Sequence, residues 1–380
     1  MSKEAIPINP AVLTWARTRA GFSIDEAKEH FKDIEAWEDL NQESGPSYPQ
    51  LEKLADKFKT PIAVFFFPEP PDLEPIGNSF RTMPEQQFEL IPRQVRFLLR
   101  KAKALQLNLA ELNNGHNPAA HVITRELSFP VNVSIADMAT AVRNYLGITL
   151  EQQMGWASPE KALESWRHRL HDFGIFVFKD AFKQADFSGF CLYDDAFPVI
   201  YVNNSTSKTR QIFTLFHELA HLLFHTSGVD KFQDDYIDAL AGDAKRIEIL
   251  CNRFAARFLV PDDAFEQQMG GLDADRETAS LLAGRFHVSR EVIYRMMLDR
   301  NLINQAEYTD AAVAWAGEKK SGTGGDYYNN QIAYLGPRYI SLAFQQYYNN
   351  RIDQTQLADY LNIAPRNVGP LEEKLIRREA

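Results

Sequence analysis

The sequence predicts an α+β protein that is mostly helical, with a core of one small sheet and one long helix between helical N- and C-terminal modules. Three observations predict this class. Helical periodicity dominates both ends of the chain, short β-rich runs follow Gly174, and an almost wholly apolar helix comes directly after those runs. With 380 residues, the chain is long enough for two or three domains.

The composition is typical of a folded protein, with 45% hydrophobic and 24% charged residues. The net charge of -10 argues against a surface that binds nucleic acid throughout. Two cysteines, Cys191 and Cys251, are too few for a disulfide framework. The sequence contains no apolar run long enough to span a membrane and no secretory leader, so we expect a cytoplasmic protein without a membrane partner.

Residues 1–70 are predicted to form a small helical module. Ser23 and Glu26 make a capping box that begins one of its helices. Apolar periodicity indicates further helices over residues 11–20, 47–58 and 61–67. The prolines of residues 67–75 cannot continue a helix, and they mark the end of the module. Residues 71–160 then form a helical linker region, in which residues 91–112 and 135–147 are the clearest helices.

Residues 161–305 are predicted to form the core domain. Short β-rich runs at residues 174–178, 187–193 and 198–202 are separated by Gly, Pro and Asp, which indicates a small sheet. Two strong helices follow, one carrying the sequence FTLFHELAHLLFH (213–225) and one over residues 244–260, which stops at Pro261. Residues 306–380 are a C-terminal helical module, which we expect to cap the core domain, with binding to a partner as the alternative.

Two histidines of the first of these helices are candidate metal ligands. His217 and His221 are four residues apart, so both imidazoles leave the same face of the helix. This spacing suits one Zn²⁺, which takes nitrogen ligands from a rigid support. Glu218 lies between them and is placed to take a proton from zinc-activated water as general base. The pattern is HExxH, and its apolar surroundings mean that these polar side chains need partners.

The third ligand is expected from the second helix. Glu248 flanks the apolar stripe of residues 244–260, where a carboxylate needs a cation or hydrogen-bond donors. His225 lies eight residues after His217, roughly 12 Å along the helix, so we expect it to contact a ligand or to pack rather than bind the same ion. The alternatives to Glu248 are four acidic residues of the polar connector, namely Asp234, Asp235, Asp238 and Asp243.

These residues resemble a known family. The stretches RQIFTLFHELAHLLFH (210–225) and ExxxNRFAARFLVP (248–261), with GFCLYDDAFPVIYVN upstream, are similar to the ImmA/IrrE family of zinc metallopeptidases. The resemblance implies a zincin-like core with His217, His221 and Glu248 as zinc ligands and Glu218 as general base. It also implies that Asn252 supports a ligand without binding the metal. Cys251 departs from the family, which usually has alanine there; we interpret it as a core residue, with a redox-sensitive thiol as the alternative.

The N-terminal module resembles the Xre/Cro-type helix-turn-helix that many family members carry. It departs from that pattern because the usual turn and the start of the recognition helix are missing after Phe31. The surviving segment is acidic, which is unfavourable beside phosphates, and its acidic residues are Asp33, Glu35, Glu38, Asp39 and Glu43. A degenerate module for protein contact or dimerisation is therefore at least as good an interpretation as DNA binding.

The sequence predicts a regulatory zinc endopeptidase that hydrolyses a peptide bond in a specific partner protein. The resemblance implies that this partner is a helix-turn-helix transcriptional repressor of a stress or mobile-element programme. We expect an extended substrate to add as a strand to a sheet edge at residues 187–193. The alternative function is a non-enzymatic transcriptional regulator or antitoxin that binds DNA or the toxin product of a neighbouring gene.

Overall fold

A computed structural model of the chain describes residues 5–40, 44–72, 91–184, 186–231, 240, 242–318 and 326–379. The chain divides into two compact units. The first comprises residues 1–78 and 91–97, and the second comprises residues 79–90 and 98–380. No described helix has the length and apolarity that crossing a membrane requires. The α+β, mostly helical class is confirmed, while the four-segment division predicted from the sequence stays a prediction.

The first unit is a bundle of short helices around its own apolar core. The predicted capping box is present, because the Ser23 hydroxyl accepts from the Glu26 N–H and the Glu26 carboxylate accepts from the Ser23 N–H. Arg17 forms a bidentate ion pair with Glu38, with N–O distances of 2.7 and 2.9 Å. The elements of the first unit are α1 (Pro10–Arg19), α2 (Ile24–Lys28), α3 (Ile34–Trp37), α4 (Tyr48–Phe58) and the 3₁₀ helix η1 (Ile62–Phe66).

The ion pair of Arg17 changes how the acidic segment is interpreted. The sequence predicts that Glu38 faces phosphates, but its carboxylate is directed toward Arg17 and its side chain is about 10% exposed. Asp33 and Glu35 are exposed, and Glu43 lies outside the described residues. The helix α3 has only four residues, which agrees with the missing start of a recognition helix.

The second unit is built on a four-stranded sheet with the order β1-β3-β2-β4. Strands β1 (Phe176–Asp180) and β3 (Val199–Asn203) pair in parallel, whereas β2 (Phe187–Leu192) is antiparallel to both β3 and β4 (Val229–Lys231). The three predicted strands are therefore confirmed, and β4 is an addition that the sequence analysis missed. The prediction that residues 187–193 form a sheet edge is wrong, because β4 covers that side of β2.

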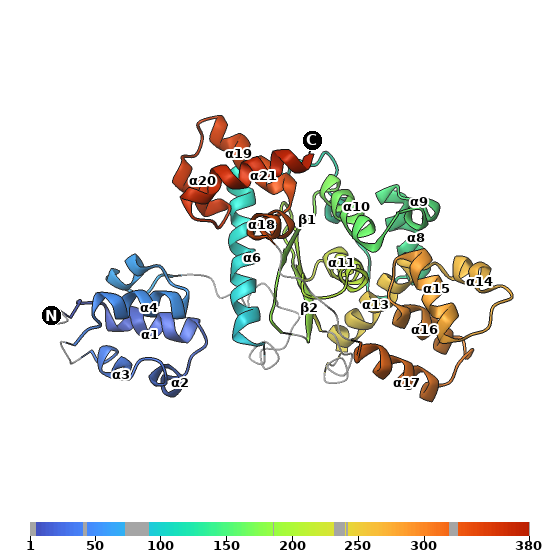
Figure 1. Cartoon of the computed structure of the whole chain (residues 1–380), viewed down its shortest axis with the longest axis horizontal. Helices are drawn as coiled ribbons and strands as arrows, with labels where there is room; N and C mark the ends of the chain where they lie inside the picture. The colour runs from blue at the N-terminus through green and yellow to red at the C-terminus, as the bar shows by residue number, and fades with distance from the viewer. Residues whose placement is uncertain are drawn as a thin grey trace. The chain divides into compact units, whose positions relative to one another are not determined.

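Helices cover both faces of this sheet (Figure 1). One face carries α11 (Lys208–Leu223), and the other carries α6 (Arg93–Leu112) and α18 (Tyr327–Leu335). Gly189 on β2 lets α11 approach closely, since a Cβ there would lie 2.4 Å from the Thr214 methyl carbon. On the opposite face, the Gln106 amide of α6 donates to the carbonyl of Phe197, just before β3.

The aromatic contact between α11 and α13 (Gly242–Leu259) fixes these two helices against each other. Phe216 and Phe258 are stacked with ring centroids 4.2 Å apart. Trp166 of α10 (Pro159–Asp172) packs edge-on against Phe216, with centroids 4.8 Å apart, and at a tilt against Phe258, with centroids 5.5 Å apart. All three side chains are buried. Phe216 directly precedes His217 in the chain, so the cluster anchors the turn of α11 that carries this histidine.

The C-terminal end of α13 is held by polar side chains of neighbouring helices. The Gln153 amide of α9 (Leu150–Met154) donates to the carbonyls of Leu259 and Phe286, at 2.9 and 3.0 Å. Arg143 of α8 (Ile135–Leu146) donates to the Gln153 side-chain oxygen and to the Phe258 carbonyl. These bonds satisfy carbonyls that a helix end leaves without intrahelical partners.

The remaining helices enclose this core. Arg167 joins three elements, because its guanidinium donates to the carbonyl of Val177 on β1 and to that of Ala333 on α18. The helix α18 thus packs on the sheet, while the cap function of residues 306–380 stays a prediction. The other elements are α7 (Ile123–Glu126), α14 (Asp262–Met269), α15 (Arg276–Phe286), α16 (Arg290–Asp299), α17 (Gln305–Ala316), α19 (Pro337–Tyr348), α20 (Gln354–Tyr360), η3 (Pro365–Asn367) and α21 (Val368–Glu379).

The position of Gln153 gives a test of this arrangement. We expect Gln153→Ala to lower the free energy of unfolding of the second unit by about 2 to 4 kcal/mol, because two buried carbonyls lose their donor. Glu151→Ala changes an exposed residue of the same helix and should cost under about 1 kcal/mol. Chemical denaturation followed by tryptophan fluorescence measures both. Equal losses in the two variants would contradict the role given to Gln153.

Candidate metal centre

The two helices α11 and α13 bring together three of the predicted site residues. His217, His221 and Glu248 are buried, and each offers a ligand atom within 4.8 Å of the other two. The Nε2 atoms of His217 and His221 are 3.2 Å apart. One Glu248 oxygen lies 3.4 Å from Nε2 of His217, and the other lies 3.3 Å from Nε2 of His221.

These distances match the donor spacing of a small tetrahedral ion. Donor atoms about 2.0 to 2.1 Å from a tetrahedral zinc lie about 3.3 to 3.4 Å from one another. The set has two imidazole nitrogens and one carboxylate, which leaves a fourth position open, as in catalytic rather than structural zinc sites. The side chains of this site therefore fit a zinc ion by both geometry and chemistry.

The other nitrogen of each imidazole has a partner that fixes its orientation. His217 Nδ1 lies 3.0 Å from the side-chain oxygen of Asn252, and His221 Nδ1 lies 3.3 Å from the hydroxyl of Thr226. The Thr226 hydroxyl donates to the His221 carbonyl, so its oxygen accepts from Nδ1–H of the ring. With a cation in the site, both Nδ1 atoms would carry the proton and both Nε2 lone pairs would face the centre of the triad, whereas doubly protonated rings pair through Nε2 with the Glu248 carboxylate.

The carboxylate of Glu248 is stabilised in its charged form. Burial raises the pKa of a carboxyl group, but the attraction and hydrogen bonds of His221 and His217 outweigh this cost. They hold the pKa of Glu248 well below its ordinary value. Glu248 therefore presents an ionised ligand to the centre of the site. Glu248 is therefore a better candidate ligand than Asp243, which is exposed at the start of α13.

The remaining predicted residues have distinct positions. Glu218 is fully buried on α11, next to His217, and it also neighbours the Cys191 thiol of β2. His225 follows the end of α11, where its Nε2 contacts the Thr124 carbonyl at 3.2 Å and its ring packs on Tyr193. These contacts favour a packing role for His225. The rival ligands Asp234, Asp235 and Asp238 lie outside the described residues.

Both cysteines belong to the core beneath the site. Cys191 and Cys251 are completely buried, which favours the interpretation of Cys251 as a core residue. Burial raises the pKa of the Cys191 thiol well above its ordinary range, and the Glu218 carboxylate beside it adds to the rise. A protonated thiol of this kind is a poor nucleophile and a poor metal ligand.

Sequence reasoning missed two residues that support His221. One is Thr226, which holds Nδ1 of the ring. The other is Gly228, directly before β4: a Cβ there would lie 2.6 to 2.7 Å from Cδ2, Cγ and Nε2 of the His221 ring. The sequence marks Thr226 and Gly228 only by their position just after the helix. This signal is weak, because loop residues have no periodic pattern.

The close approach of Gly228 predicts that Gly228→Ala displaces the His221 ring and lowers the metal affinity of the site. The loss should be about 10- to 100-fold, the usual cost of disturbing a residue that supports a ligand. Competition with a chromophoric chelator measures the affinity, and circular dichroism checks that the fold is intact. Gly284→Ala is the matched control, since a Cβ at that position meets open space. Unchanged affinity in Gly228→Ala would show that the ring does not depend on this contact.

Comparison with known proteins finds similarities in the part of the chain that contains this site. Residues 170–298 match the peptidase M78 family model, described as the IrrE N-terminal-like domain. The chain is similar to the radiation response metalloprotease IrrE of Deinococcus deserti, with 34% identity over 99 residues that cover 26% of this chain and 34% of the relative. The corresponding protein of Deinococcus radiodurans is 32% identical over 99 residues, covering 26% of this chain and 30% of the relative.

The chain thus spans about a third of the length of these two relatives. The family match contains all of α11 and α13, and with them the triad and Glu218. It confirms the resemblance to the ImmA/IrrE family that the histidine motif and the Glu248 helix indicated. Residues 170–298 are therefore similar to the IrrE N-terminal-like domain of the peptidase M78 family.

Proposed function

We propose that this chain is a zinc-dependent endopeptidase that hydrolyses a peptide bond in a specific partner protein. The observation that carries the proposal is the buried triad, whose three donor groups are spaced 3.2 to 3.4 Å apart beside a buried glutamate. The family match over residues 170–298 supports it. His217, His221 and Glu248 would hold the ion, and Glu218 would act on the water that attacks the substrate.

In the proposed hydrolysis, a zinc ion and the residue Glu218 have different roles. A bound zinc ion supplies a Lewis acid that lowers the pKa of water and polarises the scissile carbonyl. Glu218 takes the proton of the attacking water on a carboxylate oxygen and delivers it to the nitrogen of the leaving amine. Because Glu218 is fully buried, its proton transfers occur away from bulk water.

The strand β4 is the best candidate for substrate binding. It is the last strand in the sheet order, and Gly228 just before it contacts the His221 ring. An extended peptide that added to β4 would pass beside the triad, with main-chain hydrogen bonds supplying affinity. This proposal replaces the edge expected at residues 187–193.

The partner is expected to be a helix-turn-helix repressor, so that its cleavage releases a transcriptional programme. Both relatives are named radiation response metalloproteases, which supports a role in a stress response. The small helical first unit is suited to binding a protein partner or a second copy of the chain. Its acidic α2 and α3 segments disfavour DNA as the ligand of that unit.

Metal analysis tests the ligand set. We expect protein purified without added metal to carry one zinc ion per chain, and Glu248→Ala to lose it because one of three protein ligands is gone. His225→Ala should retain zinc, since the contacts of His225 are with Thr124 and Tyr193. Inductively coupled plasma mass spectrometry measures the content. Retention of zinc by Glu248→Ala would contradict the proposed ligand set.

The variant Glu218→Gln tests catalysis separately from metal binding. It keeps the shape of the side chain but removes the base, so cleavage of the partner should fall about 10²- to 10⁴-fold with zinc still bound. Mass spectrometry of new protein N-termini, in cells that express the wild type or the variant, identifies the substrate and measures its cleavage. A variant that cuts at the wild-type rate contradicts the proposal. A variant that cuts nothing but keeps full regulatory function supports the non-enzymatic regulator or antitoxin instead.

A further inference from the structure

Lys179 is a buried lysine without an ion pair. It lies on β1 and is only 7% exposed. Within the described parts of the chain, no hydrogen bond or ion pair joins its ammonium group to another residue. The acid next to it in the chain, Asp180, is paired instead with Lys101 of α6, at 2.7 Å. A buried charge without a partner is costly, so this position needs an explanation.

The side chain of Lys179 is directed to the face of the sheet that α11 covers. Successive residues of a strand point to opposite faces. Phe178 packs on Tyr339 of α19, whose hydroxyl accepts from Asn108 of α6, so Phe178 belongs to the face that carries α6. Lys179 therefore shares the other face with Val177, which is part of the apolar core around α11.

The first turn of α11 begins at the same end of the sheet. Strands β1 and β3 are parallel, and Lys179 pairs with Val202 one residue before the end of each strand. The chain leaves β3 at Asn203, and α11 begins at Lys208 with Ser207 as its N-cap. Ligands of α/β proteins bind beyond the carboxyl ends of parallel strands, and a helix N-terminus there favours an anion.

Cations outnumber acids around Lys179. Burial lowers the pKa of Lys179 well below its ordinary value, and repulsion from Arg167 of α10, Lys208 and Arg378 of α21 adds to this effect. The hydrogen bonds of Arg167 are with main-chain carbonyls. Glu164 is the acid of this cluster, and it is already paired with Arg378 at 3.2 Å. The cluster therefore lacks a negative charge beside Lys179.

We propose that Lys179 and Lys208 bind a phosphate group at the start of α11, either as inorganic phosphate or as a phosphate ester. Its oxygens can accept from both ammonium groups and from the N–H groups that the first turn of a helix leaves without partners. A phosphate fits better than a carboxylate, because it brings a charge of about -1.5 to -2 and more acceptor oxygens. The inference does not depend on the proposed peptidase function. It places a second ligand on the helix that carries His217 and His221.

Thermal unfolding of the zinc-loaded full chain tests this site. Sodium phosphate is compared with sodium chloride at equal pH and ionic strength, so that general screening is the same in both. We expect Tm to rise with phosphate concentration and to saturate, because a ligand that binds the native state stabilises it. Phenyl phosphate is the second probe, and it distinguishes a site that admits phosphate esters from one that holds the free ion alone.

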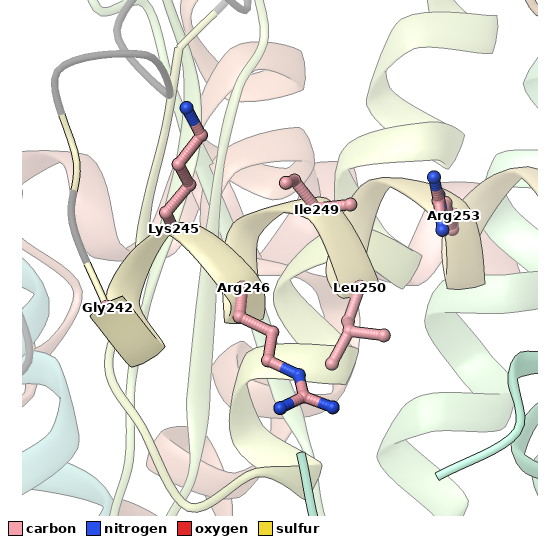
Figure 2. Close-up of a pocket in the computed structure, with 6 residues that line it drawn as sticks. All are labelled: Gly242, Lys245, Arg246, Ile249, Leu250 and Arg253. Carbon is pink, nitrogen blue, oxygen red and sulfur yellow. The ribbon is translucent and has the colours of Figure 1, made fainter. Parts of the chain in front are cut away.

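The variant Lys179→Met removes the ammonium group and keeps an unbranched side chain. We expect it to raise the apparent Kd for phosphate about tenfold, and Lys208→Gln, at a less buried position, to raise it about two- to fivefold. The matched control is Arg246→Gln, which should leave the Kd unchanged. It removes an exposed cation from another basic cluster, a pocket of about 430 Å³ on α13 that Lys245 and Arg253 also line (Figure 2).

Loss of the phosphate effect in Lys179→Met, with retention in Arg246→Gln, supports the site. An unchanged effect in Lys179→Met overturns the inference, because the phosphate then binds elsewhere, for example on the zinc ion. Loss in Arg246→Gln alone assigns the phosphate to the α13 pocket and also overturns it, as does the absence of a saturable rise with either probe. Should Lys179→Met fail to fold, Lys208→Gln decides in the same way. None of these results bears on cleavage of a partner protein, so the proposed function is tested separately.

Discussion

The contact between α11 and α13 is the constraint on which the site depends. The three groups that could hold a metal come from two helices that are separated in the chain by β4 and its flanking residues. The stacked rings of Phe216 and Phe258, wedged by Trp166, fix the distance and rotation of these helices. A small rotation of either helix would separate donor atoms that now lie 3.2 to 3.4 Å apart. The apolar core thus sets the geometry of the polar centre.

Burial of the triad has an electrostatic cost, and the arrangement offsets it in two ways. Asn252 and Thr226 satisfy the Nδ1 atoms of the imidazoles, so each ring is desolvated with its second nitrogen directed to the centre. The buried Glu248 carboxylate is stabilised by the two rings when these are protonated, and a bound cation would take over that role. Apolar side chains in place of this buried triad would stabilise the fold more. The triad is therefore more readily explained by metal binding than by a contribution to folding stability.

Much of this site could be predicted from the sequence because its signals are local. The spacing of His217 and His221 follows from helical geometry, and Glu248 stands out as a carboxylate beside an apolar stripe. The three longer strands were also predictable from their β-rich composition. The short β4 was missed, because three residues carry too little periodicity to distinguish a strand from a loop.

Other features could not be predicted, because they arise from contacts between distant parts of the chain. The order of strands in a sheet is such a feature, and for that reason residues 187–193 were wrongly placed at an edge. The contacts of Thr226 and Gly228 with His221 depend on how the chain returns after α11. The inward direction of Glu38 likewise follows from its pairing with Arg17, 21 residues away.

The central claim is that two imidazoles and one carboxylate hold a single zinc ion. Zinc K-edge X-ray absorption on protein purified without added metal tests it most directly, because the method reports the identity and distance of the ligand atoms. The account predicts a shell of nitrogen and oxygen at about 2.0 to 2.1 Å, with the outer scattering of two imidazole rings. A sulfur neighbour at about 2.3 Å would instead place Cys191 or Cys251 on the metal and contradict the account.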